Sequence, residues 1–313
     1  MPPATSSPDP AASRFAADAA FAQAVAEQAG AIQRERYERV GEIAYKSAKD
    51  VVTEVDHLSE ALILSAIRER YPGDGILAEE SGEHPGRGRG RLAPGQAGRV
   101  GDRDAVDRSA DDARAVEPAE PDARSLAHGR TWIVDPLDGT VNYANGLPLF
   151  CVSVALAVDG RPAVGAVHDP MRGETFWATS DGPAMLGDRV VRASSKDRLS
   201  DLVLQLALSG RAATSRSHAV RRAVRVTRNI GSSALAFTYV AAGRFDAAIQ
   251  TAGMSSWDIA AAGLIAERAG AVVTDADGGP WFDVSRAPRT SGCLAAPPAH
   301  HAELLRLSRR ATP

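Results

Sequence analysis

The sequence predicts a mixed α and β protein, with an α+β half at residues 14–193 and an α/β half at 194–313. Two observations support this prediction. Strand-like segments follow one another closely between Cys151 and Ala178, as they do in antiparallel sheets. Beyond Ser194, strand-like and helical segments alternate. The 313 residues are enough to enclose a sizeable hydrophobic core.

Composition narrows the class of protein. Hydrophobic residues make up 44% and charged residues 24% of the chain, as in soluble globular proteins. The net charge of -3 gives no reason to expect nucleic acid or an anionic membrane as partner, and no apolar run could span a membrane. Cys151 and Cys293 form no Cys-x-x-Cys pair, which argues against a zinc site or a disulfide framework.

The first residues do not have the order of a secretion signal. Met1–Ser13 is rich in Pro, Ala and Ser and lacks a charged segment followed by an apolar one. We therefore expect a disordered tail on a cytoplasmic protein.

Two helices and a strand are predicted next. Apolar residues recur on one side of Arg14–Val40, which favours a helix. A second helix is predicted over His57–Arg70, where Tyr71-Pro72-Gly73 ends it. The short apolar run Ile76–Ala78 predicts a strand.

The segment from about residue 84 to residue 130 differs from the rest of the chain. It contains no Phe, Trp, Tyr or Ile and is dominated by Arg, Asp, Ala, Gly and Pro. Such a composition cannot bury enough apolar surface to offset the entropy of ordering. We expect a disordered insertion, for which a genuine loop and a sequencing frameshift corrected further on are both open explanations.

Order returns at Thr131, and the remaining elements are predicted from local pattern. Strands are expected at Trp132–Val134, Cys151–Val158, Pro162–His168, Glu174–Ala178, Leu202–Leu206, Phe245–Gln250, Ala271–Thr274 and Leu294–Ala296. Helices are expected near Ser217–Arg225 and at Ser233–Ala242, Ile259–Ala269 and His300–Arg310.

Acidic residues stand at the ends of four predicted elements, where sites are normally built. They are Asp50 to Asp56, Glu79 with Glu80, Asp135 with Asp138, and Asp258. Two carboxylates that face one small volume repel each other unless a cation lies between them. Oxygen ligands without a His or Cys cluster favour Mg²⁺ over Zn²⁺. Gly139 and Thr140 then begin a short helix, whose N–H groups favour an anion.

Each acidic position also has a purely structural explanation, which the residues alone leave open. Asp56 could be a helix N-cap, and Asp258 a first-turn acid that complements the helix dipole. Glu79-Glu80 could be an exposed turn, and Asp135-Pro136 an ordinary turn at the end of a strand.

With these motifs in this order, the chain resembles the inositol monophosphatase family of Mg²⁺-dependent, lithium-sensitive phosphatases. The first motif is Asp135-Pro136-Leu137-Asp138-Gly139-Thr140, followed by Val141-Asn142-Tyr143. The second is Trp257-Asp258-Ile259-Ala260-Ala261-Ala262-Gly263, and Ala78-Glu79-Glu80-Ser81 matches the acidic strand end. The resemblance implies a layered αβαβα sandwich, of the type that inositol monophosphatases share with fructose bisphosphatases, and a homodimer.

The resemblance also implies roles for the acidic residues. Glu79, Asp135 and the backbone carbonyl of Leu137 would hold a first Mg²⁺ ion. Asp135, Asp138 and Asp258 would hold a second. A third, looser ion would contact Glu79 through water, which adds Glu79 to the catalytic residues.

Thr140 and Asp56 would complete the catalytic set by orienting and helping to deprotonate the attacking water. Backbone N–H groups of Gly139 and Thr140 would receive the phosphate. The implied substrate-binding residues are Asp138, Gly139, Thr140, Gly231, Ser232, Ser233, Gln250 and Asp258.

The expected activity is hydrolysis of a small phosphate monoester, inositol 1-phosphate first. Inositol-using members commonly carry a Glu where this chain has Gln250 or Thr251, and a neutral amide can still bond a hydroxyl. Fructose 1,6-bisphosphatase, 3′-nucleotidase and histidinol phosphatase activities remain alternatives, with histidinol phosphate disfavoured by the missing carboxylate. A non-catalytic binding protein on the same scaffold is the alternative from another class.

Overall fold

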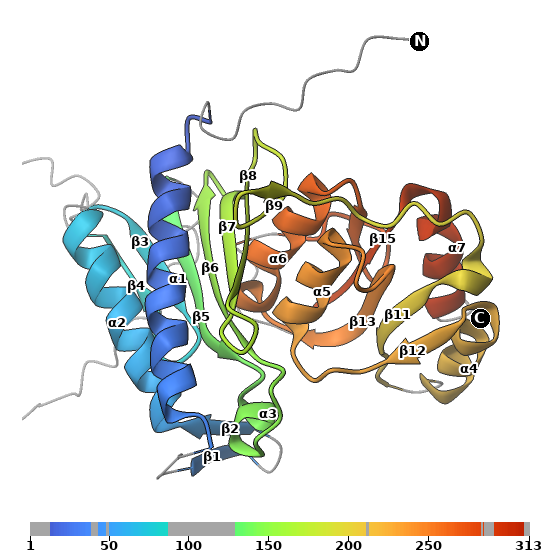
Figure 1. Ribbon diagram of the computed structural model, residues 1–313, viewed down its shortest axis with the longest axis horizontal. Helices are drawn as coiled ribbons and strands as arrows, with labels where there is room; N and C mark the ends of the chain where they lie inside the picture. The colour runs from blue at the N-terminus through green and yellow to red at the C-terminus, as the bar shows by residue number, and fades with distance from the viewer. Residues whose placement is uncertain are drawn as a thin grey trace, which may run out of the picture.

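The structure is a computed structural model that describes residues 13–38, 43–47, 50–86, 129–210, 213–282, 284 and 291–309. Of the predicted disordered tail only Ser13 falls within these ranges, and residues 87–128 of the predicted insertion lie outside them. The described residues form five layers, in the order helices, sheet, helices, sheet, helices (Figure 1). The layered αβαβα arrangement is therefore confirmed.

The first layer consists of α1 (Ala16–Arg36) and α2 (Glu54–Arg70). Ala19, Ala22 and Ala29 of α1 are buried on one side, as their spacing predicts. The second helix begins three residues earlier than predicted, because Thr53 caps it and accepts a hydrogen bond from the Val55 backbone nitrogen at 3.2 Å.

The second layer is an eight-stranded sheet in the order β10-β9-β8-β7-β6-β5-β3-β4. Only β3 and β5 pair in parallel; the other neighbours are antiparallel. The strands are β3 (Gly75–Ala78), β4 (Gly82–His84), β5 (Arg130–Asp138), β6 (Cys151–Val158), β7 (Arg161–Asp169), β8 (Glu174–Thr179), β9 (Met185–Leu186) and β10 (Arg189–Val190).

Helices cover both faces of this sheet, so its central strands are buried on both sides. Trp132 and Val134 of β5 belong to the core formed with α1 and α2, whereas Ile133 belongs to the core on the opposite face. A strand with two buried faces is expected to be continuously apolar rather than alternating. The run Trp132-Ile133-Val134 has that character.

The other three layers come from the later part of the chain. α5 (Ser233–Ala241) and α6 (Ser256–Arg268) lie between the sheets, and α4 (Ala213–Ala223) and α7 (Pro298–Ser308) form the far side (Figure 1). The second sheet has the order β12-β11-β13-β15-β14, with β11 parallel to both β12 and β13 and β15 antiparallel to its neighbours. Its strands are β11 (Val203–Ala207), β12 (Val226–Arg228), β13 (Ala247–Met254), β14 (Val272–Asp275) and β15 (Ser291–Ala296).

Most of the helices and strands that the sequence analysis did not predict are short. A two-stranded hairpin of β1 (Ile43–Ser47) and β2 (Asp50–Thr53) lies near α3 (Thr140–Ala144), as Figure 1 shows. These strands, like β4, β9, β10 and β12, have five residues or fewer. So short a segment contains too few residues to display a periodic pattern.

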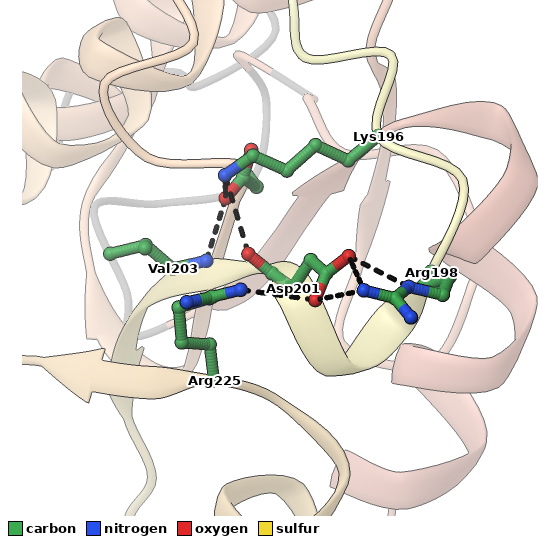
Figure 2. Close-up of polar contacts among 6 residues, drawn as sticks. Lys196, Arg198, Asp201, Val203 and Arg225 are labelled. Carbon is green, nitrogen blue, oxygen red and sulfur yellow. Dashed lines mark hydrogen bonds and ion pairs between the residues drawn. The ribbon is translucent and has the colours of Figure 1, made fainter.

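A polar cluster fixes the connection between the two sheets (Figure 2). The buried carboxylate of Asp246 accepts hydrogen bonds at Oδ2 from Lys196 Nζ at 2.7 Å and from the Val203 backbone nitrogen at 2.6 Å. At the surface, Asp201 forms ion pairs with Arg198 and Arg225. This cluster attaches the connecting segment to the start of β11, while the division into two halves near Ser194 stays a prediction.

Within the described residues, no helix has both the length and the apolar character needed to cross a membrane.

Candidate active site

Asp135 and Asp138 come from the end of β5, which continues through the predicted turn. The pairing with β6 shifts between these two residues, so Asp135 lies opposite Ser153 and Asp138 opposite Cys151. A proline is tolerated in a strand at such an irregularity, and Pro136 occupies it. Both carboxylates are buried, with Asp135 only 1% exposed. The bulge therefore brings two acids, three positions apart, toward one volume.

Asp258 joins them from the first turn of α6. Its Oδ2 accepts a hydrogen bond from the Ser255 backbone nitrogen at 2.7 Å, as part of a capping box. Carboxylate oxygens of Asp135, Asp138 and Asp258 all lie within 4.8 Å of one another. Asp258 is thus a first-turn acid of α6, as its structural explanation requires. The same side chain also lies close to Asp135 and Asp138.

Glu79 approaches the same group from the end of β3. Its backbone nitrogen donates to the carbonyl of Val134 at 3.1 Å, which places it beside the end of β5. The charge of Glu79 contributes to the raised pKa of both Asp135 and Asp258. Acids that are distant in sequence therefore gather in one place, as the sequence predicts.

Burial and mutual repulsion mark this group as one that suits a cation. Burial, followed by the charges of Glu79, Asp138 and Asp258, raises the pKa of Asp135 well above its ordinary value. Burial and then the charge of Asp138 do the same for Asp258. Among the residues whose side chains the structure describes, no Lys, Arg or His forms an ion pair with Asp135, Asp138 or Asp258. Crowded carboxylates without such partners fit a hard divalent cation.

Cys151 lies close to this group without offering a soft ligand. Its Sγ is 3.8 Å from Oδ2 of Asp138. Burial, with the charges of Asp138 and Asp135, raises the pKa of the Cys151 thiol well above its ordinary value. The side chains that converge as candidate metal ligands are the three aspartates, so their donors are oxygen atoms.

Asp138 is held by the start of α5. Its Oδ2 accepts hydrogen bonds from the Ser232 hydroxyl, from the Ala234 nitrogen at 2.7 Å and from the Leu235 nitrogen at 3.4 Å. The Ser233 nitrogen donates to Oδ1 at 3.2 Å. These bonds oppose the effect of burial, which is the main cause that raises the pKa of Asp138. Most hydrogen bonds from the start of α5 thus go to Oδ2 of Asp138. Oδ1 accepts only the bond from the Ser233 nitrogen among these, so it is the oxygen more available to the acidic group.

Thr140 and Asp56 form a hydroxyl–carboxylate pair. Thr140 Oγ1 lies 3.0 Å from Oδ1 of Asp56 and 2.9 Å from the carbonyl oxygen of Leu137. Asp56 is fully buried, and its Oδ2 accepts from the backbone nitrogen and the hydroxyl of Thr53 at 2.8 and 2.6 Å. Burial raises the pKa of Asp56, while the bonds from Thr53 and Thr140 lower it. Asp56 is thus the third helical residue of α2, and the N-cap is Thr53.

Gly139 lies at the start of α3 in a conformation that favours glycine. Its φ is +97°, and a Cβ atom there would lie 2.8 Å from the carbonyl oxygen of Leu149. The glycine therefore allows the chain to turn sharply between Asp138 and Thr140.

The remaining predicted residues lie around the start of α5. Gly231 precedes it, and Ser233 Oγ donates to Oε1 of Gln250 at 3.1 Å. Gln250 comes from β13 and is partly exposed. The Ser232 side chain is buried and turned toward Asp138.

Three further residues contact the site and were given no role from the sequence. Gln33 of α1 donates to the Pro136 carbonyl at 2.6 Å, Asn142 donates to the carbonyls of Leu149 and Ile230, and Gln205 contacts the residues before α5. Asn142 stands in the run Val141-Asn142-Tyr143 quoted with the first motif, a signal that could have given it a role. Gln33 and Gln205 carry no local signal.

Comparison with known proteins agrees with this geometry. The profile of the inositol monophosphatase family matches residues 16–312. The chain is 34% identical over 280 residues to Nus factor SuhB of Pasteurella multocida, covering 87% of each chain. It is 32% identical over 247 residues to inositol-1-monophosphatase of Mesorhizobium japonicum, covering 76% of this chain and 77% of the relative.

Among solved structures, the extragenic suppressor protein SuhB of Bartonella henselae is similar, with a TM-score of 0.76 and 27% identity, over 95% of this chain and 100% of the other. Sequence motifs, fold and acidic group lead to one conclusion: the chain belongs to the inositol monophosphatase family.

Proposed function

We propose that the protein hydrolyses a small phosphate monoester, inositol 1-phosphate first, with Mg²⁺ as its cofactor. One observation carries the proposal: the carboxylates of Asp135, Asp138 and Asp258 converge within 4.8 Å, from separate parts of the chain, with Glu79 beside them. Membership of a phosphatase family and the relative named inositol-1-monophosphatase support it.

The donor set fits two or three Mg²⁺ ions. Glu79, Asp135 and the Leu137 carbonyl would hold one, and Asp135, Asp138 and Asp258 another. Such ions supply Lewis-acid chemistry, which makes a water more acidic and stabilises the oxygen that departs from phosphorus. The side chains keep these positions because β5, β3 and α6 are packed within the core.

Thr140 and Asp56 would handle the proton of the attacking water. As the water oxygen forms a bond to phosphorus and the bond to the alcohol oxygen breaks, the water proton passes to Thr140 Oγ1. The Thr140 proton passes in turn to Oδ1 of Asp56, which is 3.0 Å away. The departing alkoxide takes a proton from solvent. Burial raises the pKa of Asp56, which makes it a better base than an exposed aspartate.

The substrate would be held between α3 and α5. Backbone N–H groups of Gly139 and Thr140 would receive the phosphate. Ser233 and Gln250 already contact each other at 3.1 Å, and their hydroxyl and amide can bond the hydroxyls of a polyol. The absence of a carboxylate on Gln250 disfavours a cationic substrate amine, and therefore histidinol phosphate.

The relatives named Nus factor SuhB favour one second candidate, because that name denotes no hydrolytic activity. The candidate is a non-catalytic binding role on the same scaffold. A variant without turnover, such as Asp138→Asn, would separate the two roles in a functional test in cells.

A panel of phosphate esters tests the proposed activity. Phosphate release is measured from inositol 1-phosphate, fructose 1,6-bisphosphate, a nucleoside 3′-phosphate and histidinol phosphate, with Mg²⁺, with EDTA, and with Mg²⁺ plus Li⁺. We expect Mg²⁺-dependent, Li⁺-inhibited release, fastest from inositol 1-phosphate. The absence of phosphate release from every ester would contradict the proposal. Faster release from fructose 1,6-bisphosphate or from the nucleoside 3′-phosphate would assign that ester as the substrate in place of inositol 1-phosphate. Analytical sedimentation of the purified protein would test the homodimer, and fractionation of cells would test the cytoplasmic location.

A further inference from the structure

The turn at residues 229–231, between β12 and α5, is held by a side chain of α3. Asn142 Nδ2 donates to the carbonyl oxygen of Ile230 at 2.7 Å and to that of Leu149 at 2.6 Å. Asn142 is only 7% exposed. Both hydrogens of one amide group are therefore used to tie together two segments that are distant in sequence, the end of the 145–150 loop and the turn before α5.

A second side chain holds the same turn from the small sheet. Gln205 of β11 accepts a hydrogen bond at Oε1 from the Ile230 nitrogen at 3.1 Å, and its Nε2 donates to Oδ1 of Asn229 at 3.2 Å. Oδ1 of Asn229 also accepts from the Gly231 nitrogen at 3.1 Å. Gln205 is 2% exposed. The nitrogen and the carbonyl of Ile230 are thus bound by side chains from two different elements.

Gly231 shows how closely the turn fits against Asn142. Its φ is +73°, and a Cβ atom there would lie 2.9 Å from Oδ1 and 3.0 Å from Nδ2 of Asn142. A side chain at this position would therefore displace the amide that holds the turn. The turn and Asn142 behave as one packed unit.

The turn leads directly into the donors that hold Asp138. Ser232 follows Gly231, and its hydroxyl and the next backbone nitrogens donate to the Asp138 carboxylate. A shift of the turn would move these donors, and the carboxylate with them. Hydrogen bonds that orient a metal ligand commonly affect metal affinity about 10- to 100-fold.

We propose that Asn142 is a positioning residue: by fixing the 229–231 turn it sets the start of α5, and through α5 the orientation of Asp138 toward the metal, with Gln205 as the second anchor of the turn. This rests on the proposed function. It assigns Asn142 no contact with substrate, and its effect is transmitted through Asp138.

The experiment compares two substitutions at Asn142 with a matched control. Asn142→Ala removes the amide, and Asn142→Asp keeps the shape but presents a carboxylate to two carbonyl oxygens. The control is Asn145→Ala at the C-cap of the same helix, since Asn145 is exposed and its side chain donates to the Val141 carbonyl at 2.7 Å. Mg²⁺ affinity is measured by calorimetry without substrate, alongside kcat, KM, the Mg²⁺ concentration for half-maximal activity, and the melting temperature.

We expect both Asn142 variants to bind Mg²⁺ more weakly by up to about 10-fold, the lower end of the range for groups that bond a metal ligand directly. The fractional loss of kcat should exceed the fractional change in KM, and Asn145→Ala should match the wild type. Mg²⁺ affinity and kcat within twofold of the wild type in both Asn142 variants would overturn the proposal, as would a fall in melting temperature alone.

Gln205→Glu gives a second route if Asn142 variants fail to fold. It keeps the acceptor for Ile230 and removes the donor to Asn229, so a weaker loss of Mg²⁺ affinity is expected, and an unchanged affinity would count against the proposal. A wild-type protein that binds Mg²⁺ but releases phosphate from no ester would defeat the proposed function alone, because the calorimetry needs no turnover.

Discussion

Oδ2 of Asp138 lies 2.7 Å from the backbone nitrogen of Ala234, in the first turn of α5. Asp138 belongs to the eight-stranded sheet, whereas α5 precedes the central strand of the five-stranded sheet. The acidic group is therefore built at the contact between the two parts of the fold. A carboxylate at a helix N-terminus is also stabilised by the helix dipole. The helix thus lowers the cost of keeping a charged Asp138 among other acids.

Gly139→Ala should destabilise the protein and abolish turnover. A left-handed conformation costs an L-residue about 1–2 kcal/mol, and the added Cβ would lie 2.8 Å from the carbonyl oxygen of Leu149. Gly146→Ala is the control, because Gly146 also has a positive φ of +70° but its nearest contact would be 3.9 Å away. Chemical denaturation and phosphate release should show a larger loss for Gly139→Ala. Equal stability losses with retained activity would refute this account of the turn.

Thr140→Ala should reduce kcat by about 10²- to 10⁴-fold, the usual contribution of a positioned proton-transfer group. KM should change little, because the backbone nitrogen that we assign to the phosphate remains. Thr140→Ser keeps a hydroxyl near Asp56 and should retain most of the turnover. Steady-state kinetics check this, and a variant that loses KM but not kcat would exclude the assigned proton transfer.

Local sequence was enough to predict the main elements and the acidic residues at their ends, and the resemblance to the family implied that these acids meet. Cys151–Val158 is a strand over the predicted residues, and α5 and α6 begin within three residues of the predictions. Motif residues at the ends of β3, β5 and α6 do meet. These predictions succeed because periodicity and the chemistry of neighbouring residues are visible within a few positions of the sequence.

What the sequence did not predict depends on contacts between distant segments. The continuation of β5 through Pro136 needs β6 as its partner, which local pattern cannot show. Ser232 was expected to face substrate, whereas its hydroxyl bonds Asp138, a residue 94 positions away. Gln205 is polar in a buried strand, and only the folded chain shows that the Ile230 nitrogen satisfies it.

Asp246→Ala should lower the free energy of unfolding by about 1–3 kcal/mol, because it leaves the Val203 backbone nitrogen without its acceptor. Lys196, whose side chain is 44% exposed, can regain water after the substitution. Asp201→Ala in the same cluster (Figure 2) is the comparison. Its loss should be much smaller, because its partners Arg198 and Arg225 are mostly exposed. Denaturant titrations that rank the two variants in the opposite order would contradict this.

His168 should make the protein less stable in mild acid. Burial lowers the pKa of His168 below its ordinary value of 6.5, and the charges of Glu27 and Asp169 only partly oppose this. The unfolded chain therefore binds the proton more readily. Stability is fully present above pH 6.5 and is lost as the pH falls through the folded-state pKa, by up to about 1.4 kcal/mol per pH unit.

Replacing His168 tests this dependence. In the structure, His168 Nδ1 lies 3.0 Å from the Thr175 hydroxyl, a contact that the shorter amide of His168→Asn can imitate. The variant should lose stability at all pH values but show a shallower decline between pH 7 and pH 5 in denaturant titrations. An unchanged slope would show that His168 is not responsible.

The melting temperature with and without Mg²⁺, compared between the wild type and Asp135→Asn, tests the central claim most directly. At a Mg²⁺ concentration 100 times the dissociation constant, binding should stabilise the wild type by about 2.7 kcal/mol. Asp135→Asn removes a buried charge that Glu79, Asp138 and Asp258 repel. It should therefore melt no lower than the wild type in EDTA and gain nothing from Mg²⁺. A wild type that ignores Mg²⁺, or a variant that responds equally at matched ionic strength, would contradict the claim that these acids hold a divalent ion.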